Sequence, residues 1–182
     1  MFVFAAVQAE RAYPGWLTSD LRGNHAGEVA AVELCRGALA ATRCPALQAQ
    51  IHDHFRTERR HVALIEAILD PTAHSRLMPV WRFLGRAVGF LSCAISARFY
   101  HRTMEGVESF ADRHYEKQIQ RLHALRGHRE LRRVLEVCRG DEIRHRAEAA
   151  DGAGRPAGLP GQLWWRVVTI GSAAAIAVAR RF

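Results

Sequence analysis

Strand patterns are almost absent from this sequence, and stretches with helical spacing fill most of it. Glycine and proline, which interrupt helices, gather at a few places, chiefly 14–15, 45, 71–79, 127 and 152–161. Between these places, apolar residues recur every three or four positions, as they do on one face of a helix. The sequence therefore predicts an all-α fold.

Five long helical segments are expected. Ser19 or Asp20 is a plausible N-cap for the first segment, because short polar side chains accept the free N–H groups of a first helical turn. A glycine- and proline-rich link over 151–161 should separate the last helix from the rest. The expected bounds of the segments are 19–42, 45–69, 81–125, 130–150 and about 162–181.

The length of 182 residues is that of one domain, here placed at 19–182 behind an N-terminal extension over 1–18. The extension lacks the basic and long apolar regions of a signal peptide, so we expect a cytoplasmic location. The formal net charge of +8 favours an anionic partner, either nucleic acid or a membrane surface. Arginines are spread along the whole chain without a nucleic-acid-binding motif, so we expect no nucleic acid. The four cysteines form no CxxC pair, which argues against a disulfide framework or a zinc ribbon.

Two stretches, 87–97 and 167–179, carry no charge, and both are shorter than the roughly 18–20 residues needed to cross a bilayer. They are interpreted either as two buried core helices or as helices that lie on a membrane face. Arginines flank both stretches, and Trp164 and Trp165 precede the second. Such flanks suit the headgroup level, so with the positive charge they favour the membrane interpretation and a membrane-associated C-terminal helix.

Two ExxH motifs carry the chemistry of this chain: Glu58 with His61, and Glu142 with His145. A spacing of three places both side chains of a pair on one helix face. A further glutamate lies on the helix before each motif, 30 residues ahead of the first and 34 ahead of the second. The order Glu, ExxH, Glu, ExxH is that of ferritin-like di-iron four-helix bundles. The predicted metal ligands are Glu28, Glu58, His61, Glu108, Glu142 and His145.

The residue types suit two irons, because four carboxylates balance the charge of two ferrous ions and can bridge them, while each imidazole adds a neutral donor. A lone ExxH occurs often by chance as two solvated neighbours, but two of them on separate helices, each behind a glutamate helix, favour a metal site. His25, three residues before Glu28, and His114, six after Glu108, could support the ligands. The other histidines are expected at the surface: His52, His54, His74, His101, His123 and His128.

The motif from Asn24 to Glu28 resembles the first ligand motif of the demethoxyubiquinone hydroxylases, which are di-iron monooxygenases of ubiquinone biosynthesis. The likeness covers about 19–182 and includes the C-terminal alanine-rich helix with its basic pair. Further motifs match that family in order: Glu58-Arg59-Arg60-His61, Leu77-Met78-Pro79-Val80-Trp81, Val107-Glu108, His114-Tyr115 and Asp141-Glu142-Ile143-Arg144-His145.

The resemblance assigns roles to the predicted ligands. It implies that Glu28 and Glu108 bind one iron each and that Glu58 and Glu142 bridge the two, while His61 and His145 each bind one iron. By the same resemblance, His114 and Tyr115 lie near the quinone or support the ligands, and they are the candidate catalytic residues.

The resemblance also implies an activity, namely ring hydroxylation of a methoxy-methyl-polyprenyl benzoquinone with O₂ and with NADH as electron source. It implies a peripheral protein on the cytoplasmic face of a bacterial cell membrane, with a homo-oligomer and a lipid-presenting accessory protein as further partners. No GxGxxG motif occurs, so the sequence does not locate NADH. The alternative is a ferritin-like iron-oxidising or storage protein, which would use the same ligands without the apolar, Trp-flanked stretches.

One region departs from the family pattern. Arg86, Arg98, His101 and Arg102 occupy positions that are small or apolar in the family, ahead of the third ligand helix. This departure leaves the metal ligands untouched and bears on the quinone channel. We expect the polyprenyl tail to lie along the charge-free stretch 87–97, near Leu91, and along the C-terminal helix.

Overall fold

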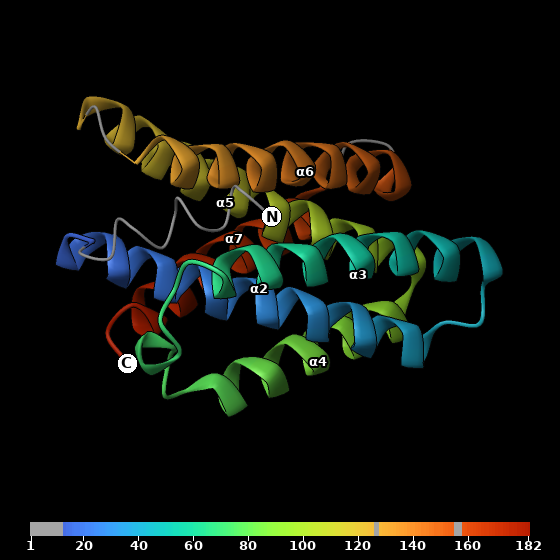
Figure 1. Ribbon diagram of the computed structural model, residues 1–182. Helices are drawn as coiled ribbons and strands as arrows, with labels where there is room; N and C mark the ends of the chain where they lie inside the picture. Colours follow the sequence, from blue (N-terminus) through green and yellow to red (C-terminus); the bar gives the residue numbers. More distant parts are fainter. Residues whose placement is uncertain (1–12, 126–127, 155–157) are drawn as a thin grey trace.

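The computed structural model describes residues 13–125, 128–154 and 158–182, and within these ranges it contains helices and no strands (Figure 1). The predicted all-α, ferritin-like bundle is thereby confirmed. Helices α2, α3, α5 and α6 form the bundle, α4 packs along α2, and α7 packs against α5 and α2. Most of the expected N-terminal extension, 1–12, lies outside the described residues, and the domain start at 19 stays a prediction. The elements are α2 (Gly15–Ala41), α3 (Pro45–Glu66), η1 (Pro71–Ala73), α4 (Met78–Ile95), α5 (Ala97–Ala124), α6 (Arg129–Ala153) and α7 (Leu159–Ala179).

The first helix starts earlier than expected. Pro14 is its N-cap and Gly15 its first residue, so the predicted cap at Ser19 or Asp20 is wrong. The hydroxyl of Ser19 instead donates a hydrogen bond to the backbone oxygen of Arg180 at 2.9 Å, and Asp20 forms an ion pair with the Arg180 guanidinium at 2.5 Å. These polar residues therefore hold the C-terminal end of α7 against α2.

The predicted segment 81–125 is two helices rather than one. α4 ends at Ile95, Ser96 is extended, and α5 begins at Ala97. The Ser96 hydroxyl accepts a hydrogen bond from the backbone N–H of Phe99 at 3.1 Å, which makes Ser96 the N-cap of α5. This break lets α4 pack along α2, while α5 enters the bundle and carries Glu108 with it.

Glycines bring α4 into backbone contact with the first ligand helix. A Cβ atom on Gly89 would lie 1.9 Å from the backbone oxygen of Leu34, and one on Gly85 would lie 2.3 Å from that of Ala30. No side chain fits at such distances, so these positions require glycine. The contact fixes α4 along α2, beside Glu28.

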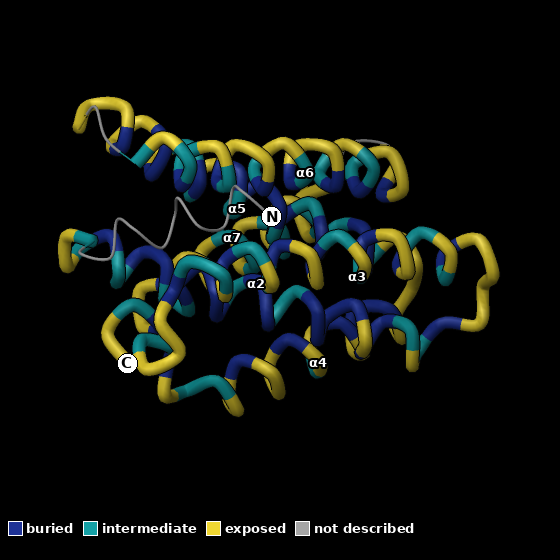
Figure 2. The backbone as a smooth tube through the Cα atoms, viewed as in Figure 1, coloured by how far each residue is buried: buried dark blue, intermediate teal, exposed yellow. Residues whose placement is uncertain are grey.

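The outer faces of α4 and α7 are exposed, whereas the buried residues face the centre of the bundle (Figure 2). In α7 only Ile176 and Ala179 are buried. The interpretation of both apolar stretches as buried core helices is therefore wrong. The helix Leu159–Ala179 extends beyond the charge-free stretch, and its 21 residues are long and apolar enough to cross a membrane by length and composition. The charge-free stretch 167–179 is too short to cross a bilayer, as expected, but the whole helix is not.

Candidate metal centre

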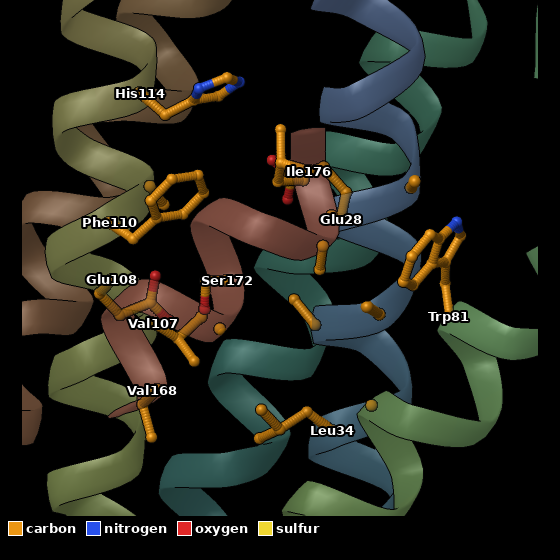
Figure 3. Close-up of a pocket in the computed structure, with 18 of the residues that line it drawn as sticks. Glu28, Leu34, Trp81, Val107, Glu108, Phe110, His114, Val168, Ser172 and Ile176 are labelled. Carbon is orange, nitrogen blue, oxygen red and sulfur yellow. The ribbon is translucent and has the colours of Figure 1, made fainter. Parts of the chain in front are cut away.

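The six predicted ligands meet at the centre of the bundle. Glu28 comes from α2, and Glu108 comes from α5 on the other side of the cavity in Figure 3. The two ExxH pairs come from α3 and α6. All six side chains are buried, the most exposed being Glu28 at 6%. The six candidate residues thus converge from four helices, as the order of the motifs predicted.

The six residues form two overlapping groups. Glu28 and His61 belong to one group, Glu108 and His145 belong to the other, and both groups include Glu58 and Glu142. Within each group, one donor atom of every residue lies within 4.8 Å of the donor atoms of the others. The geometry therefore suits two adjacent cations that share two carboxylates.

The donor atoms in this cluster face one another without hydrogen bonding. The Nδ1 atom of His61 lies 3.1 Å from Glu142 and 3.4 Å from Glu28, and the Nδ1 atom of His145 lies 3.1 Å from Glu58. Neither Nδ1 atom has a hydrogen-bond partner among the described residues, and one oxygen each of Glu58 and Glu108 also has none. Buried polar atoms are rarely left without partners, and cations between them would satisfy all four. Carboxylate and imidazole donors also suit iron, so the residues fit the implied metal pair.

Crowding of carboxylates perturbs the protonation of the metal-free cluster. Burial, reinforced by the charges of Glu142 and Glu58, raises the pKa of Glu28 to about 8. Burial likewise raises the pKa of Glu108 well above its usual range. Burial alone would lower the pKa of His61, but the surrounding glutamates outweigh it and raise that pKa. The metal-free cluster therefore holds protons that an incoming cation would displace.

Two side chains hold ligands from behind. The phenol of Tyr115 donates a hydrogen bond to Glu28, which places this predicted residue in a supporting position. Asp141 lies 3.0 Å from the Nε2 atom of His61, so His61 donates to its carboxylate. Asp141 was not among the predicted site residues, although its position directly before Glu142 in the second ExxH motif is a usable signal.

His114 belongs to a buried polar cluster at one end of the cavity. Its Nε2 atom lies 3.0 Å from the amide oxygen of Asn24, and Asn24 and Gln118 exchange two amide hydrogen bonds of 2.8 and 2.9 Å. Burial lowers the pKa of His114 to about 4, so the imidazole is neutral at pH 7. Asn24 was not among the predicted site residues, although it lies four positions before Glu28 on the same helix face.

The remaining histidines divide into surface and buried residues. His25 contacts Glu66 at 3.2 Å and stacks on His74, so its described partners lie outside the ligand set. His54 and His101 are buried, and the prediction that they lie at the surface is wrong. His54 precedes Glu58 by four residues and therefore lies on the ligand face of α3. His52 and His123 are exposed as predicted, while His74 and His128 are partly buried.

An apolar cavity of about 360 Å³ leads away from the carboxylates (Figure 3). Helices α2, α4, α5 and α7 form its walls, and its lining residues on α4 and α7 follow the three- and four-residue spacing of one helix face. The lining includes Glu28, Glu108, His114 and Tyr115, among otherwise mainly apolar side chains. The cavity thus connects the candidate metal centre to the two outer helices.

The arginines that depart from the family pattern lie outside this cavity. Arg86 forms an ion pair of 2.8 Å with Glu33 of α2, and Arg102 pairs with Glu105 one turn along α5. Neither Arg98 nor His101 lines the cavity. The polar departures therefore leave the walls of the cavity apolar.

The expected path of the polyprenyl tail along residues 87–97, near Leu91, needs a correction. From the stretch 87–97 only Val88 lines the cavity, whereas Leu91 is 60% exposed and does not. The first half of α4 supplies the wall instead. Leu84 and Val88 of α4 and Val167 of α7 line the cavity and are also exposed, so the cavity reaches the surface between these two helices.

The fold and this cluster define the class of ferritin-like bundles in which carboxylates and histidines from four helices share one centre. Within that class, the chain belongs to the family described as Ubiquinone biosynthesis protein COQ7, which matches residues 16–179. The resemblance found in the motifs is thereby confirmed.

Relatives of the chain carry hydroxylase names. The chain is 32% identical over 152 residues to the 3-demethoxyubiquinol 3-hydroxylase of Paraburkholderia xenovorans, covering 80% of this chain and 68% of the relative. It is 30% identical over 167 residues to the protein of the same name from Burkholderia multivorans, covering 88% and 76%. It is 26% identical over 165 residues to the mitochondrial NADPH-dependent 3-demethoxyubiquinone 3-hydroxylase of Caenorhabditis elegans, covering 88% of both chains.

Proposed function

We propose that this chain is a di-iron monooxygenase that hydroxylates the ring of a methoxy-methyl-polyprenyl benzoquinone, demethoxyubiquinone, in ubiquinone biosynthesis. O₂ is the co-substrate, and NADH supplies the electrons. The observation that carries the proposal is the apolar cavity that joins the buried carboxylate–histidine cluster to the surface between α4 and α7. The hydroxylase names of the relatives support the same reaction class.

Glu28, Glu58, His61, Glu108, Glu142 and His145 would hold the two irons. Iron at this site supplies the activation of O₂ and the electron storage that ring hydroxylation needs. The protein's own part is to hold the ligands in place. Tyr115 fixes Glu28, and Asp141 fixes the ring of His61, as partners behind metal ligands commonly do.

The inner end of the cavity suits a quinone ring. Its walls exclude water from the ligands, and His114 and Tyr115 are polar groups of that lining that can hold or move a proton. His114 is neutral and is held by Asn24, so its imidazole has a fixed position. With Nε2 donating to Asn24, the Nδ1 atom is left as an acceptor, and we infer that His114 accepts a hydrogen bond from a hydroxyl of the reduced ring.

The polyprenyl tail would leave through the opening between α4 and α7. A long apolar tail needs an apolar exit, and both helices carry exposed apolar side chains, among them Phe83 and Leu91 on α4 and Ile170 on α7. These faces and the net charge of +8 support a protein bound to the cytoplasmic face of an anionic bacterial membrane. Because α7 packs against α5 and α2, we propose peripheral attachment. Further copies of the chain, or a lipid-presenting accessory protein, would cover the same faces.

Metal analysis combined with lipid extraction of the purified protein tests this function. We expect two irons per chain and a bound isoprenoid quinone. Iron that accumulates as mineral, with no bound quinone, would instead support the ferritin-like storage alternative. Turnover should be assayed with both nicotinamides, because the relative from Caenorhabditis elegans is named NADPH-dependent.

A further inference from the structure

The two candidate metal positions differ in what stands behind their ligands. At the His61 position, the Nε2 atom of the imidazole donates to the Asp141 carboxylate at 3.0 Å, and Glu28 accepts the Tyr115 hydroxyl. Asp141 is itself held by ion pairs with arginines, one of them Arg144 at 3.3 Å. Both terminal ligands of this position are therefore held by hydrogen bonds.

The imidazole of the His145 position has no such carboxylate behind it. Within the described part of the chain, the Nε2 atom of His145 is buried without a hydrogen-bond partner. The His145 ring instead stacks on the His54 ring, with centroids 4.1 Å apart and planes 26° apart. His54 is fixed in turn by Glu148 at 2.8 Å. A ring contact thus takes the place that a carboxylate fills at the other position.

These supports differ in their effect on a metal. A carboxylate behind an imidazole fixes its tautomer and makes it a stronger donor, and losing such a partner costs about 10- to 100-fold in metal affinity. A stacked ring restrains the plane of the imidazole and does neither. We propose that the two positions bind metal unequally: the His61 position fills first, and the His145 position is the weaker, exchangeable one. Asp141 and His54 are then the positioning residues of the two sites. This inference rests on the proposed two-metal centre.

Titration of the metal-free protein with Co²⁺, followed by its visible absorption and by calorimetry, tests the inequality. We expect two steps whose affinities differ by about tenfold or more. Asp141→Asn should weaken the first step by about tenfold. Arg60→Gln, which removes an ion pair of Asp141 and leaves its contact with His61, should leave both steps in place and is the matched control.

The Asp141→Asn variant also distinguishes two unequal positions from two equal positions at which the first bound ion repels the second. If the positions were equal, metal would enter the intact His145 position first, and Asp141→Asn would weaken only the second step. That result would overturn the proposal. At the other position, His54→Ala should weaken the second step, and His54→Phe, which keeps a stacked ring, should restore it. An unchanged second step in His54→Ala would remove His54 from this role.

A measurement on the parent protein needs no variant. Crystals given one equivalent of Co²⁺ should show anomalous scattering mainly beside His61, and equal peaks at both positions would overturn the proposal. Failure of the proposed function looks different, because the folded parent protein would then bind fewer than two metal ions at saturation.

Discussion

Ala31 offers the sharpest test of the quinone cavity. It lies one helical turn after Glu28, on the face of α2 that lines the cavity from Asn24 to Leu34. Ala31→Leu adds three carbon atoms to that wall without altering a metal ligand or a charge. The added atoms should occupy space that the quinone needs.

The size of the effect follows from the lost contacts. Each buried methylene contributes about 0.8 kcal/mol, so displacing three carbons of substrate costs about 2.4 kcal/mol, or roughly a 60-fold rise in KM. The assay is the KM of the iron-loaded enzyme for a long-tailed quinone, with iron content measured on the same samples. Ala40→Leu is the matched control, because Ala40 is exposed on the same helix and does not line the cavity. An unchanged KM in folded, iron-loaded Ala31→Leu would refute this cavity as the quinone site.

Three further predictions concern the metal and the membrane. Glu142→Ala removes a residue common to both metal groups and should lower bound iron by more than half, whereas unchanged iron content would exclude Glu142 from the site. The side chain of Phe83 on α4 is 71% exposed, and Phe83→Asp should weaken binding to anionic liposomes and make that binding more salt-sensitive. Val137→Asp, at an exposed position on α6, is the control. Equal losses of liposome binding in both variants would contradict a membrane contact through α4. Because burial raises the pKa of metal-free Glu28 to about 8, this carboxyl is protonated at pH 7, so iron binding should release protons and weaken as pH falls. Calorimetry in buffers of different ionisation enthalpy measures that release, and affinity independent of pH would contradict it.

The convergence of the six candidate residues could be predicted because the faces they occupy depend on local helical geometry. Glu58 and His61 share a helix face through their spacing, wherever the helix packs. The order of the four ligand helices then allowed one bundle centre to be inferred. The supporting residues are partly readable by the same rule, since Asn24 lies one turn from Glu28 and His54 one turn from Glu58.

Other features depend on contacts between distant segments. Ser96 lies in a run without glycine or proline, so the end of α4 is not visible in composition, although serine is a favoured N-cap. The backbone contact of Gly89 with Leu34 joins two helices, and no pattern within either helix reveals it. The same holds for the cavity, whose walls combine α2 and α5 with the two outer helices. Apolar composition alone could not tell Val88, which lines the cavity, from Leu91, which does not.

Isotope tracing tests the central claim most directly. Iron-loaded protein, given demethoxyubiquinone, NADH and oxygen-18 gas, should form a ring-hydroxylated quinone, and mass spectrometry should find one labelled oxygen atom in it. The other oxygen atom should leave as water, as a monooxygenase requires. The Glu142→Ala variant should form almost no labelled product under the same conditions. Hydroxylated product without the label, or no product from folded protein that holds two irons, would contradict the account.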